Sequence, residues 1–172
     1  MTPRYLPPRL LRAHDDTSSF VSRSEEQTTW CREFAHQSQT SGGTAVHVVQ
    51  VAGSDVVAGF YAWRMAEIRH EDSPSRMRKG AGRYPQPVAL IARLAVDTRH
   101  EGMGLGSGML RDALLRSIDV SVRIGCRGVV LHCETESARS FYLHHIPGFL
   151  ESPSDPLHLV LLMKDIRRSL RI

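Results

Sequence analysis

The hydrophobic positions of this chain change their spacing along its length, and that change predicts alternating strands and helices. Two runs rich in β-branched and aromatic side chains meet at Gly53-Ser54, which is typical of a β-hairpin. Nearly unbroken apolar runs are expected in central buried strands. On this basis we predict strands at residues 44–53, 55–68, 87–97, 128–134 and 157–166.

Other segments carry apolar residues three or four positions apart, which favours helices. We predict these helices at residues 24–39, from near Leu105 to a stop at Gly125, and at 136–145. Ser24 and Thr135 are suitable N-caps for the first and third, and Trp30 and Phe34 share one face of the first. The second helix has apolar residues at Leu110, Leu114, Ile118 and Val122.

This alternation indicates a mixed α/β fold in which helices pack on a sheet. The length of 172 residues suits a single domain over residues 1–172, and 41% hydrophobic residues can supply its core. Residues 69–86 are rich in Pro, Gly and charge, and a loop of this length is more often functional than idle. No apolar run reaches the roughly 18 residues of a membrane span, and the start lacks a secretory signal. We therefore expect a soluble cytoplasmic protein with no membrane partner.

Cysteine and histidine spacing gives no sign of a metal site or a disulfide framework. Cys31, Cys126 and Cys133 are odd in number and form no CxxC pair. The nine histidines show no ligand spacing such as HExxH. We expect no bound metal.

The charge is moderately basic, with 22 Lys and Arg against 18 Asp and Glu, a net charge of +4. Either the charges are well mixed over the surface, or basic clusters bind a polyanion. One cluster lies in the 69–86 loop and contains Arg69, Arg76, Arg78, Lys79 and Arg83. The other is at the C-terminus and contains Lys164, Arg167, Arg168 and Arg171.

The stretch DTRHEGMGLGSGML, residues 97–110, joins a predicted buried strand to a predicted helix. Its alternate glycines expose main-chain N–H groups at a helix start, which favours binding of an anion such as a phosphate. No Lys-Ser/Thr pair follows the last glycine, so a Walker A loop is excluded. The spacing also fails the dinucleotide fingerprint GxGxxG. A loop that cradles a pyrophosphate with main-chain N–H groups alone remains.

The segment LAVDTRHEGMGLGSGMLRDAL, followed by ESARSFY and then GF, resembles the acyl-CoA motif of the GCN5-related N-acetyltransferase (GNAT) superfamily. The resemblance covers roughly residues 88–150. It implies a central mixed, mostly antiparallel sheet flanked by helices and splayed at the acyl-CoA site, with acetyl-CoA as cosubstrate. The segments RLAVD, GFYAW, SPSDPLHLVLLMKDI and HDDTSSF further resemble the tRNA-acetylating toxins of that superfamily. That likeness implies acetylation of the amino group of aminoacyl-tRNA, which blocks translation. It also implies a ribbon-helix-helix antitoxin as partner and a homodimer.

The resemblance also assigns roles to individual residues. Main-chain groups that hold the acyl-CoA are expected at Leu94, Ala95, Val96, Gly102, Met103, Gly104, Leu105, Gly106 and Ser107. Of these, Ala95 and Val96 would polarise the thioester carbonyl. Tyr142 would protonate the departing thiolate as general acid, since a phenol with a pKa of about 10 is protonated at neutral pH. The alternative is that Phe141 and Tyr142 form only an aromatic pair in the core. The position of Arg93 in RLAVD matches the toxin group, so Arg93 either reaches the tRNA 3′ end as a substrate contact or pairs with a carboxylate. Arg78 and Lys79 of the basic loop are the other substrate contacts expected.

Two departures from the family pattern and several alternatives stay open. Glu101 stands where the family usually has Gln or Arg, so it must point away from the pyrophosphate or pair, for instance with Arg99. Ile146-Pro147 lengthens the segment between Tyr142 and GF, either after the helix or by shifting its end. Possible general bases are Glu67, His132 and Glu134. The alternative functions are acetylation of a small-molecule or protein amine, and a non-catalytic CoA-binding module.

Overall fold

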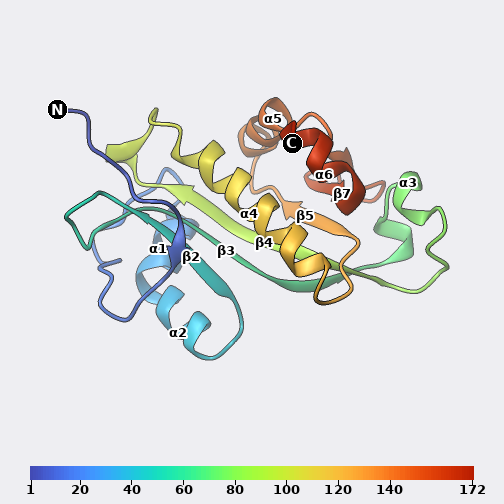
Figure 1. The fold of residues 1–172 in the computed structure, drawn as a ribbon, viewed down its shortest axis with the longest axis horizontal. Coiled ribbons are helices and arrows are strands. Elements are labelled where there is room, and N and C mark those ends of the chain that lie inside the picture. Colours follow the sequence, from blue (N-terminus) through green and yellow to red (C-terminus); the bar gives the residue numbers. More distant parts are fainter. The chain divides into compact units, whose positions relative to one another are not determined.

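A computed structural model describes residues 1–172 and contains one seven-stranded sheet in the order β1-β2-β3-β4-β5-β7-β6 (Figure 1). The strands are β1 (Arg9–Leu10), β2 (Ala45–Gln50), β3 (Val57–Ile68), β4 (Gln86–Val96), β5 (Gly128–His132), β6 (Leu150–Glu151) and β7 (His158–Leu162). The helices are α1 (Glu25–Glu33), α2 (Ala35–Thr40), α3 (Ser75–Arg78), α4 (Leu105–Ser121), α5 (Glu136–His145) and α6 (Met163–Leu170). Short 3₁₀ turns occupy His70–Asp72 and Thr98–His100.

The sheet is mixed and mostly antiparallel, which confirms the predicted fold class. The β1-β2, β2-β3, β5-β7 and β6-β7 pairs are antiparallel. The β4-β5 pair is parallel, and its last residue pair is Ile91 with Leu131, whereas β4 continues to Val96. None of the helices is long and apolar enough to span a bilayer.

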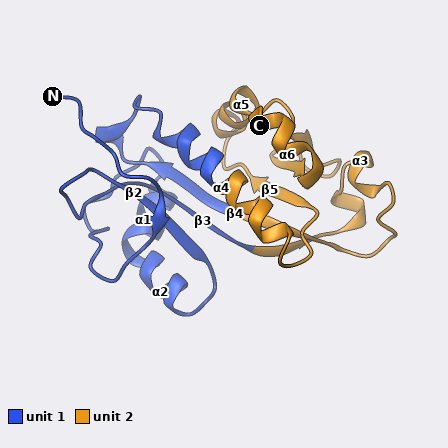
Figure 2. Cartoon of the chain, viewed as in Figure 1, with its two compact units in different colours: residues 1–64, 92–112 blue, residues 65–91, 113–172 orange.

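The chain divides into two compact units, coloured separately in Figure 2. Unit 1 comprises Met1–Arg64 and Ala92–Asp112, and unit 2 comprises Met65–Ile91 and Ala113–Ile172. This division does not test the single-domain organisation, which stays a prediction.

The core of unit 1 is built on the predicted hairpin, whose register pairs Val48 with Phe60. Side chains alternate across a strand, so Phe60 and Ala62 face one side while Tyr61 and Trp63 face the other. The first side is covered by helix α1, where the Trp30 ring stacks on Phe60 at 5.7 Å between ring centroids. On the other side, the Tyr61 hydroxyl donates to the Asp112 carboxylate of α4 at 2.6 Å.

The core of unit 2 is built on β5, β7 and the helices next to them in sequence. Gly128 begins β5 so close to β7 that a Cβ there would lie 2.5 Å from the Leu161 carbonyl oxygen. Buried side chains from α5 and the segment after it include Tyr142, Ile146 and Phe149.

Three predicted boundaries are wrong. Residues 163–166 belong to helix α6 rather than to a strand, because Ile166 and Leu170 are buried four residues apart and Arg168 pairs with Asp165. Helix α4 ends at Ser121, four residues before Gly125, and Val122 is 80% exposed. Leu110 and Leu114 of the predicted apolar face are buried, together with Met109, Ala113 and Ser117.

The third boundary lies in the first helix, which breaks at Phe34 into α1 and α2. The N-cap prediction for α1 is confirmed, since the Ser24 side chain accepts a hydrogen bond from the Gln27 N–H. The predicted loop 69–86 also contains the 3₁₀ turn His70–Asp72 and the one-turn helix α3.

A buried carboxylate fixes the end of β4 to the N-terminal segment. Asp97 has no exposed surface, and it accepts hydrogen bonds from the Val21 main chain and from the main chain and guanidinium of Arg99. Arg99 also donates to the Ser19 carbonyl, and the Thr98 N–H donates to the Val21 carbonyl. Burial alone would raise the pKa of Asp97, but these hydrogen bonds lower it to about 2.

Two glycine substitutions should move stability in opposite directions. Gly128→Ala should lower the free energy of unfolding by about 1–3 kcal/mol, because its new methyl group meets main-chain oxygen. Gly108→Ala, in α4 with open space around its Cβ position, should raise that free energy by up to about 1 kcal/mol. Urea unfolding followed by circular dichroism measures both. Equal effects would contradict the packing described for β5.

Asp97→Asn should destabilise the protein at neutral pH but not in acid. The lowered pKa means that Asp97 contributes stability above its ordinary value of 3.8 and loses it as pH falls toward about 2. The difference between wild type and variant should be about 2 kcal/mol near pH 7 and should vanish as pH falls toward 2. Urea unfolding at a series of pH values measures it. A difference that does not depend on pH would contradict the assignment.

Candidate functional site

The glycine loop of unit 1 leaves main-chain N–H groups uncovered at the start of the 17-residue helix α4. Gly102 and Gly104 have φ values of 73° and 78°, a conformation that other residues rarely adopt. A Cβ at either position would meet nothing within 4 Å, so both face open space. The first N–H groups of α4, from Leu105 to Ser107, have no acceptor within their own helix. With the helix dipole, they make an anion site.

The main chain that should polarise a carbonyl lies just before this loop. Leu94, Ala95 and Val96 are the last residues of β4, and the next N–H, that of Asp97, donates to the Ala58 carbonyl. Ala95 is 8% exposed and belongs to the core cluster around Phe60. Strand alternation places Arg93 on the same side as Ala95, toward α1.

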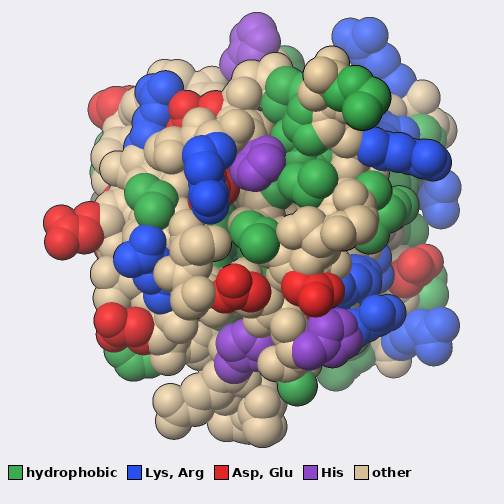
Figure 3. All heavy atoms as spheres, turned by 90° about the vertical axis from the view of Figure 1, so that its left-hand side faces the viewer, with side chains coloured by type: hydrophobic (Ala, Val, Ile, Leu, Met, Phe, Trp, Pro, Cys, Tyr) green, Lys and Arg blue, Asp and Glu red, His purple; other side chains and the backbone are tan.

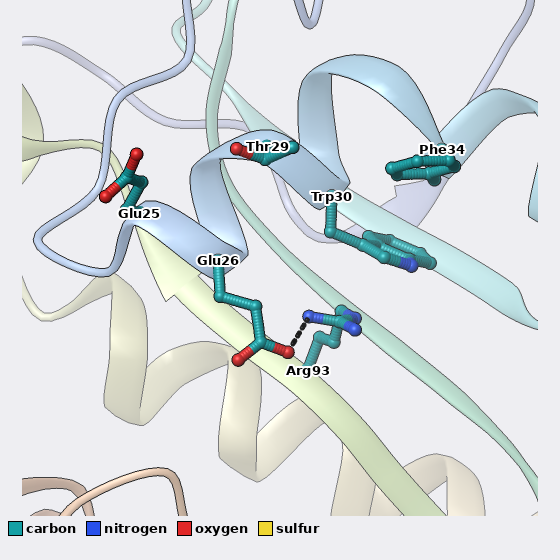
Figure 4. A pocket seen from close by; sticks show the side chains of 6 residues that line it. All are labelled: Glu25, Glu26, Thr29, Trp30, Phe34 and Arg93. Atoms are coloured by element: carbon teal, nitrogen blue, oxygen red, sulfur yellow. Dashed lines mark hydrogen bonds and ion pairs between the residues drawn. The ribbon is translucent and has the colours of Figure 1, made fainter.

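Arg93 is held by three side chains of α1. Its guanidinium lies 5.0 Å from the centre of the Trp30 ring and donates to the Glu26 carboxylate at 3.2 Å and to Gln27 at 3.3 Å. Figure 4 shows Glu26 reaching toward Arg93 beside the Trp30 ring. A groove of about 410 Å³ surrounds this group and is lined by Glu25, Glu26, Thr29, Trp30, Phe34 and Arg93.

Glu101 is neutralised by a residue that sequence reasoning did not consider. Its carboxylate pairs with Arg23 of the N-terminal segment at 2.8 Å. The suggested pairing with Arg99 is wrong, because Arg99 binds Asp97 instead. The departure from the family pattern is therefore compensated within unit 1.

Tyr142 of unit 2 is buried on α5, a helix that the sequence predicts with its correct bounds. The helix begins where the Thr135 side chain accepts a hydrogen bond from the Ala138 N–H at 3.1 Å. Tyr142 is 8% exposed and lies between the rings of Phe141 and Phe149, at centroid distances of 5.3 and 6.5 Å. Burial, with a smaller effect of Cys133, raises the Tyr142 pKa above its ordinary value of 10.

The extra residues after Tyr142 leave its helix intact. Helix α5 ends at His145, so Ile146 and Pro147 follow it. The Ile146 N–H donates to the Tyr142 carbonyl at 2.8 Å and closes the last turn. The first of the two alternatives for this insertion is therefore correct.

The two predicted substrate contacts of unit 2 differ in their surroundings. The Arg78 guanidinium donates to the carbonyls of His70, Glu71 and Ser73, so it closes the turn before α3. Lys79 is exposed directly after that helix. The suggested bases Glu67, His132 and Glu134 are also exposed and lie in unit 2.

The sequence did not predict that two arginines of unit 2 pair with one buried carboxylate. The Asp165 carboxylate, 5% exposed, pairs with Arg76 at 2.8 Å and with Arg168 of its own helix. It therefore joins one arginine of each of the two predicted basic clusters. The other basic residues of the C-terminal cluster are exposed: Lys164 and Arg167 in α6, and Arg171 directly after it.

Comparison with known proteins gives a family match over most of the chain. Residues 10–149 match the acetyltransferase (GNAT) family. A tRNA-acetylating toxin of Mycobacterium tuberculosis is 40% identical over 163 residues, which make up 95% of this chain and 95% of that protein.

Solved structures share the fold at low identity. AtaT complexed with acetyl-methionyl-tRNAfMet has a TM-score of 0.87 and 18% identity, covering 97% of this chain and 99% of its own. A Tyr-to-Phe mutant of AtaT, bound to acetyl-CoA and the C-terminus of the antitoxin AtaR, has a TM-score of 0.80 and 16% identity over 98% and 99% of the chains. Since the family match spans most of the sequence and the mycobacterial relative nearly all of it, the chain belongs to the acetyltransferase (GNAT) family.

Proposed function

We propose that this protein is an N-acetyltransferase that moves an acetyl group from acetyl-CoA to the amino group of aminoacyl-tRNA and thereby blocks translation. The mycobacterial toxin supports the substrate, because it is named for tRNA acetylation and is 40% identical along nearly the whole chain. The observation that carries the chemistry is the phenol of Tyr142, which is 8% exposed and whose pKa is raised by burial. Acetyl-CoA would supply the acetyl group as a thioester.

Unit 1 provides the groups that bind and polarise the donor. The main chain from Gly102 to Ser107 would hold the pyrophosphate, since it presents N–H groups and the positive end of α4. Main-chain groups at Leu94, Ala95 and Val96 would hold the acyl arm. The N–H of Ala95 or Val96 would donate to the carbonyl oxygen as it gains negative charge. The ion pair with Arg23 offsets part of the negative charge of Glu101 that argued for a non-catalytic module.

Tyr142 would supply the proton that the leaving group needs. As the substrate nitrogen bonds to the acetyl carbon, the carbon–sulfur bond breaks and its electron pair stays on sulfur. The phenol donates its proton to that sulfur and regains one from solvent, while the substrate nitrogen releases one to solvent. Burial keeps the phenol protonated at all physiological pH values, because it raises the Tyr142 pKa.

The basic side chains of unit 2 would bind the phosphates of the tRNA backbone. Figure 3 shows one face of the molecule, on which basic and acidic side chains are interspersed, so the whole surface does not carry a single sign of charge. Local clusters must therefore provide the attraction to phosphates. The proposed contacts in this unit are the exposed basic side chains of α6, together with Arg76 and Lys79. Arg78 would act mainly by shaping the loop that carries them.

The proposed partners follow from the toxin relatives. A relative of the same fold was solved with the C-terminus of its antitoxin. We propose that an antitoxin of the ribbon-helix-helix type also binds this chain, that the chain forms a homodimer, and that it acts in the cytoplasm, where charged tRNA occurs.

Tyr142→Phe should lower kcat for acetyl transfer at least about 100-fold, because it removes the proton donor. The KM for acetyl-CoA should stay within about twofold, since the ring and its packing remain. Steady-state kinetics with purified charged tRNA measures both constants. Tyr84→Phe, at an 81% exposed tyrosine, is the matched control and should change neither. A fully active Tyr142→Phe enzyme would overturn the assigned role.

Replacing both Lys164 and Arg167 by Ala should raise KM for charged tRNA and weaken its dependence on salt. Each lost phosphate contact should reduce the slope of log affinity against log salt by about one. Measuring KM between about 50 and 200 mM salt tests this slope. Arg123→Ala, which removes an exposed base outside both clusters, serves as control. An unchanged slope in the double variant would exclude α6 from the tRNA contact.

A further inference from the structure

We propose that Arg23 binds the pyrophosphate of coenzyme A directly, as a cation that the N-terminal segment supplies to the glycine loop and that Glu101 holds in position. This inference rests on the proposed function and deepens it, because it adds a side-chain donor from outside the loop to the main-chain groups proposed there. Arg23, Glu101 and the loop all belong to unit 1.

The N-terminal segment lies against the turn that leads into the glycine loop. The Val21 N–H donates to the buried carboxylate of Asp97 at 3.0 Å, and the Thr98 N–H donates to the Val21 carbonyl at 2.8 Å. Two residues after Val21, the Arg23 side chain reaches the carboxylate of Glu101. The main chain that carries this arginine is therefore fixed beside the start of the loop.

Glu101 engages only part of the Arg23 guanidinium. One carboxylate oxygen, Oε2, accepts a hydrogen bond from Nε at 3.1 Å and lies 2.8 Å from Nη2. A guanidinium has five N–H donors in a rigid planar fork, so this pairing leaves donors for a second anion. The Arg23 side chain is 83% exposed, whereas that of Glu101 is only 32% exposed. The fork is therefore open to a ligand while it is held by the carboxylate.

The glycine loop has no cationic side chain of its own for an anion with two negatively charged phosphates. Residues 102–110 include no Lys, Arg or His. Arg99 stands just before them, but both oxygens of the buried Asp97 carboxylate accept its hydrogen bonds. Arg23 is an exposed cation bound to Glu101, which directly precedes the first glycine of the loop. It therefore supplies positive charge at the place where the loop itself lacks it.

A positioning role gives Glu101 a reason to stand before a phosphate-binding loop. An exposed ion pair contributes little to stability, so stability does not explain an acidic residue at this place. Glu101 instead restricts the long Arg23 side chain to the start of the loop, and an ordered side chain loses less conformational freedom on binding. The hydrogen bonds of an arginine to a phosphate are then about twice as strong as those between neutral groups.

The test measures binding of coenzyme A rather than turnover, and its key comparison is made in the Glu101→Gln protein. That protein has no negative charge at position 101 for Arg23 to neutralise. In this background, Arg23→Ala should raise the Kd of coenzyme A about tenfold, as expected when a hydrogen bond to a charged group is lost. Glu101→Gln alone should not weaken binding. Isothermal titration calorimetry of the wild type, both single variants and the double variant gives the four Kd values.

Three controls separate pyrophosphate binding from folding and from the other phosphate of the coenzyme. Arg23→Lys in the Glu101→Gln protein keeps the positive charge and should bind coenzyme A several-fold more tightly than Arg23→Ala does. Dephospho-coenzyme A lacks the 3′-phosphate but retains the pyrophosphate, so the effect of Arg23→Ala should persist with it. Arg12→Ala removes another exposed arginine of the N-terminal segment and should change the Kd less than about twofold, because an exposed charge without a ligand contact is screened.

The possible outcomes are distinct. If Arg23 only neutralises Glu101, the double variant will bind coenzyme A as tightly as Glu101→Gln does, and the inference is overturned while the proposed function stands. An effect of Arg23→Ala that disappears with dephospho-coenzyme A would place Arg23 at the 3′-phosphate and overturn the pyrophosphate assignment. If the wild-type protein binds no coenzyme A, the proposed function fails, and this inference falls with it.

Discussion

The arrangement of unit 1 depends on the buried carboxylate of Asp97. It stands where β4 ends and the glycine loop begins, and it binds both the N-terminal segment and Arg99. A buried charge is costly unless several partners satisfy it, and here main-chain and guanidinium donors do so. The same contact therefore sets where the strand stops, where the loop departs and which segment covers it. The main-chain groups proposed to bind acetyl-CoA lie on either side of this one residue.

The side of β4 that faces α1 is stabilised by one continuous stack of side chains. Phe60 and Trp30 pack within the core, and Arg93 continues the stack to the surface. The Arg93 guanidinium is thereby ordered by the Trp30 ring, which is itself packed on the buried ring of Phe60. Such a continuous stack explains how a long, flexible side chain such as arginine can hold a defined position at the edge of a groove.

Local patterns predicted the elements well, and long-range contacts were the part they could not supply. The hairpin, β4 and α5 follow from spacing and caps that lie within a few residues. Helix α6 was missed because its first residue, Met163, continues the apolar run of β7. Glu26 and Gln27 as hydrogen-bond partners of Arg93, Arg23 as partner of Glu101, and Val21 as partner of Asp97 lie 66 to 78 positions away in the sequence, so no local pattern names them. The glycine loop was found as an anion site from its alternate glycines before a predicted helix, whereas its assignment to acyl-CoA and the role of Tyr142 came through family resemblance. Both roles stay predictions.

The ion pair between Glu101 and Arg23 has a consequence for how this group of proteins diversifies. Arginine in the family's usual place could serve the pyrophosphate directly, whereas the acidic residue must be matched from the N-terminal segment. Either residue replaced alone leaves an unmatched charge beside the loop. The two positions should consequently change together among relatives, as a linked pair rather than as independent sites. A sequence search that scores each loop residue separately will therefore give too low a score to chains in which an acidic residue at this position is paired with an arginine of the N-terminal segment.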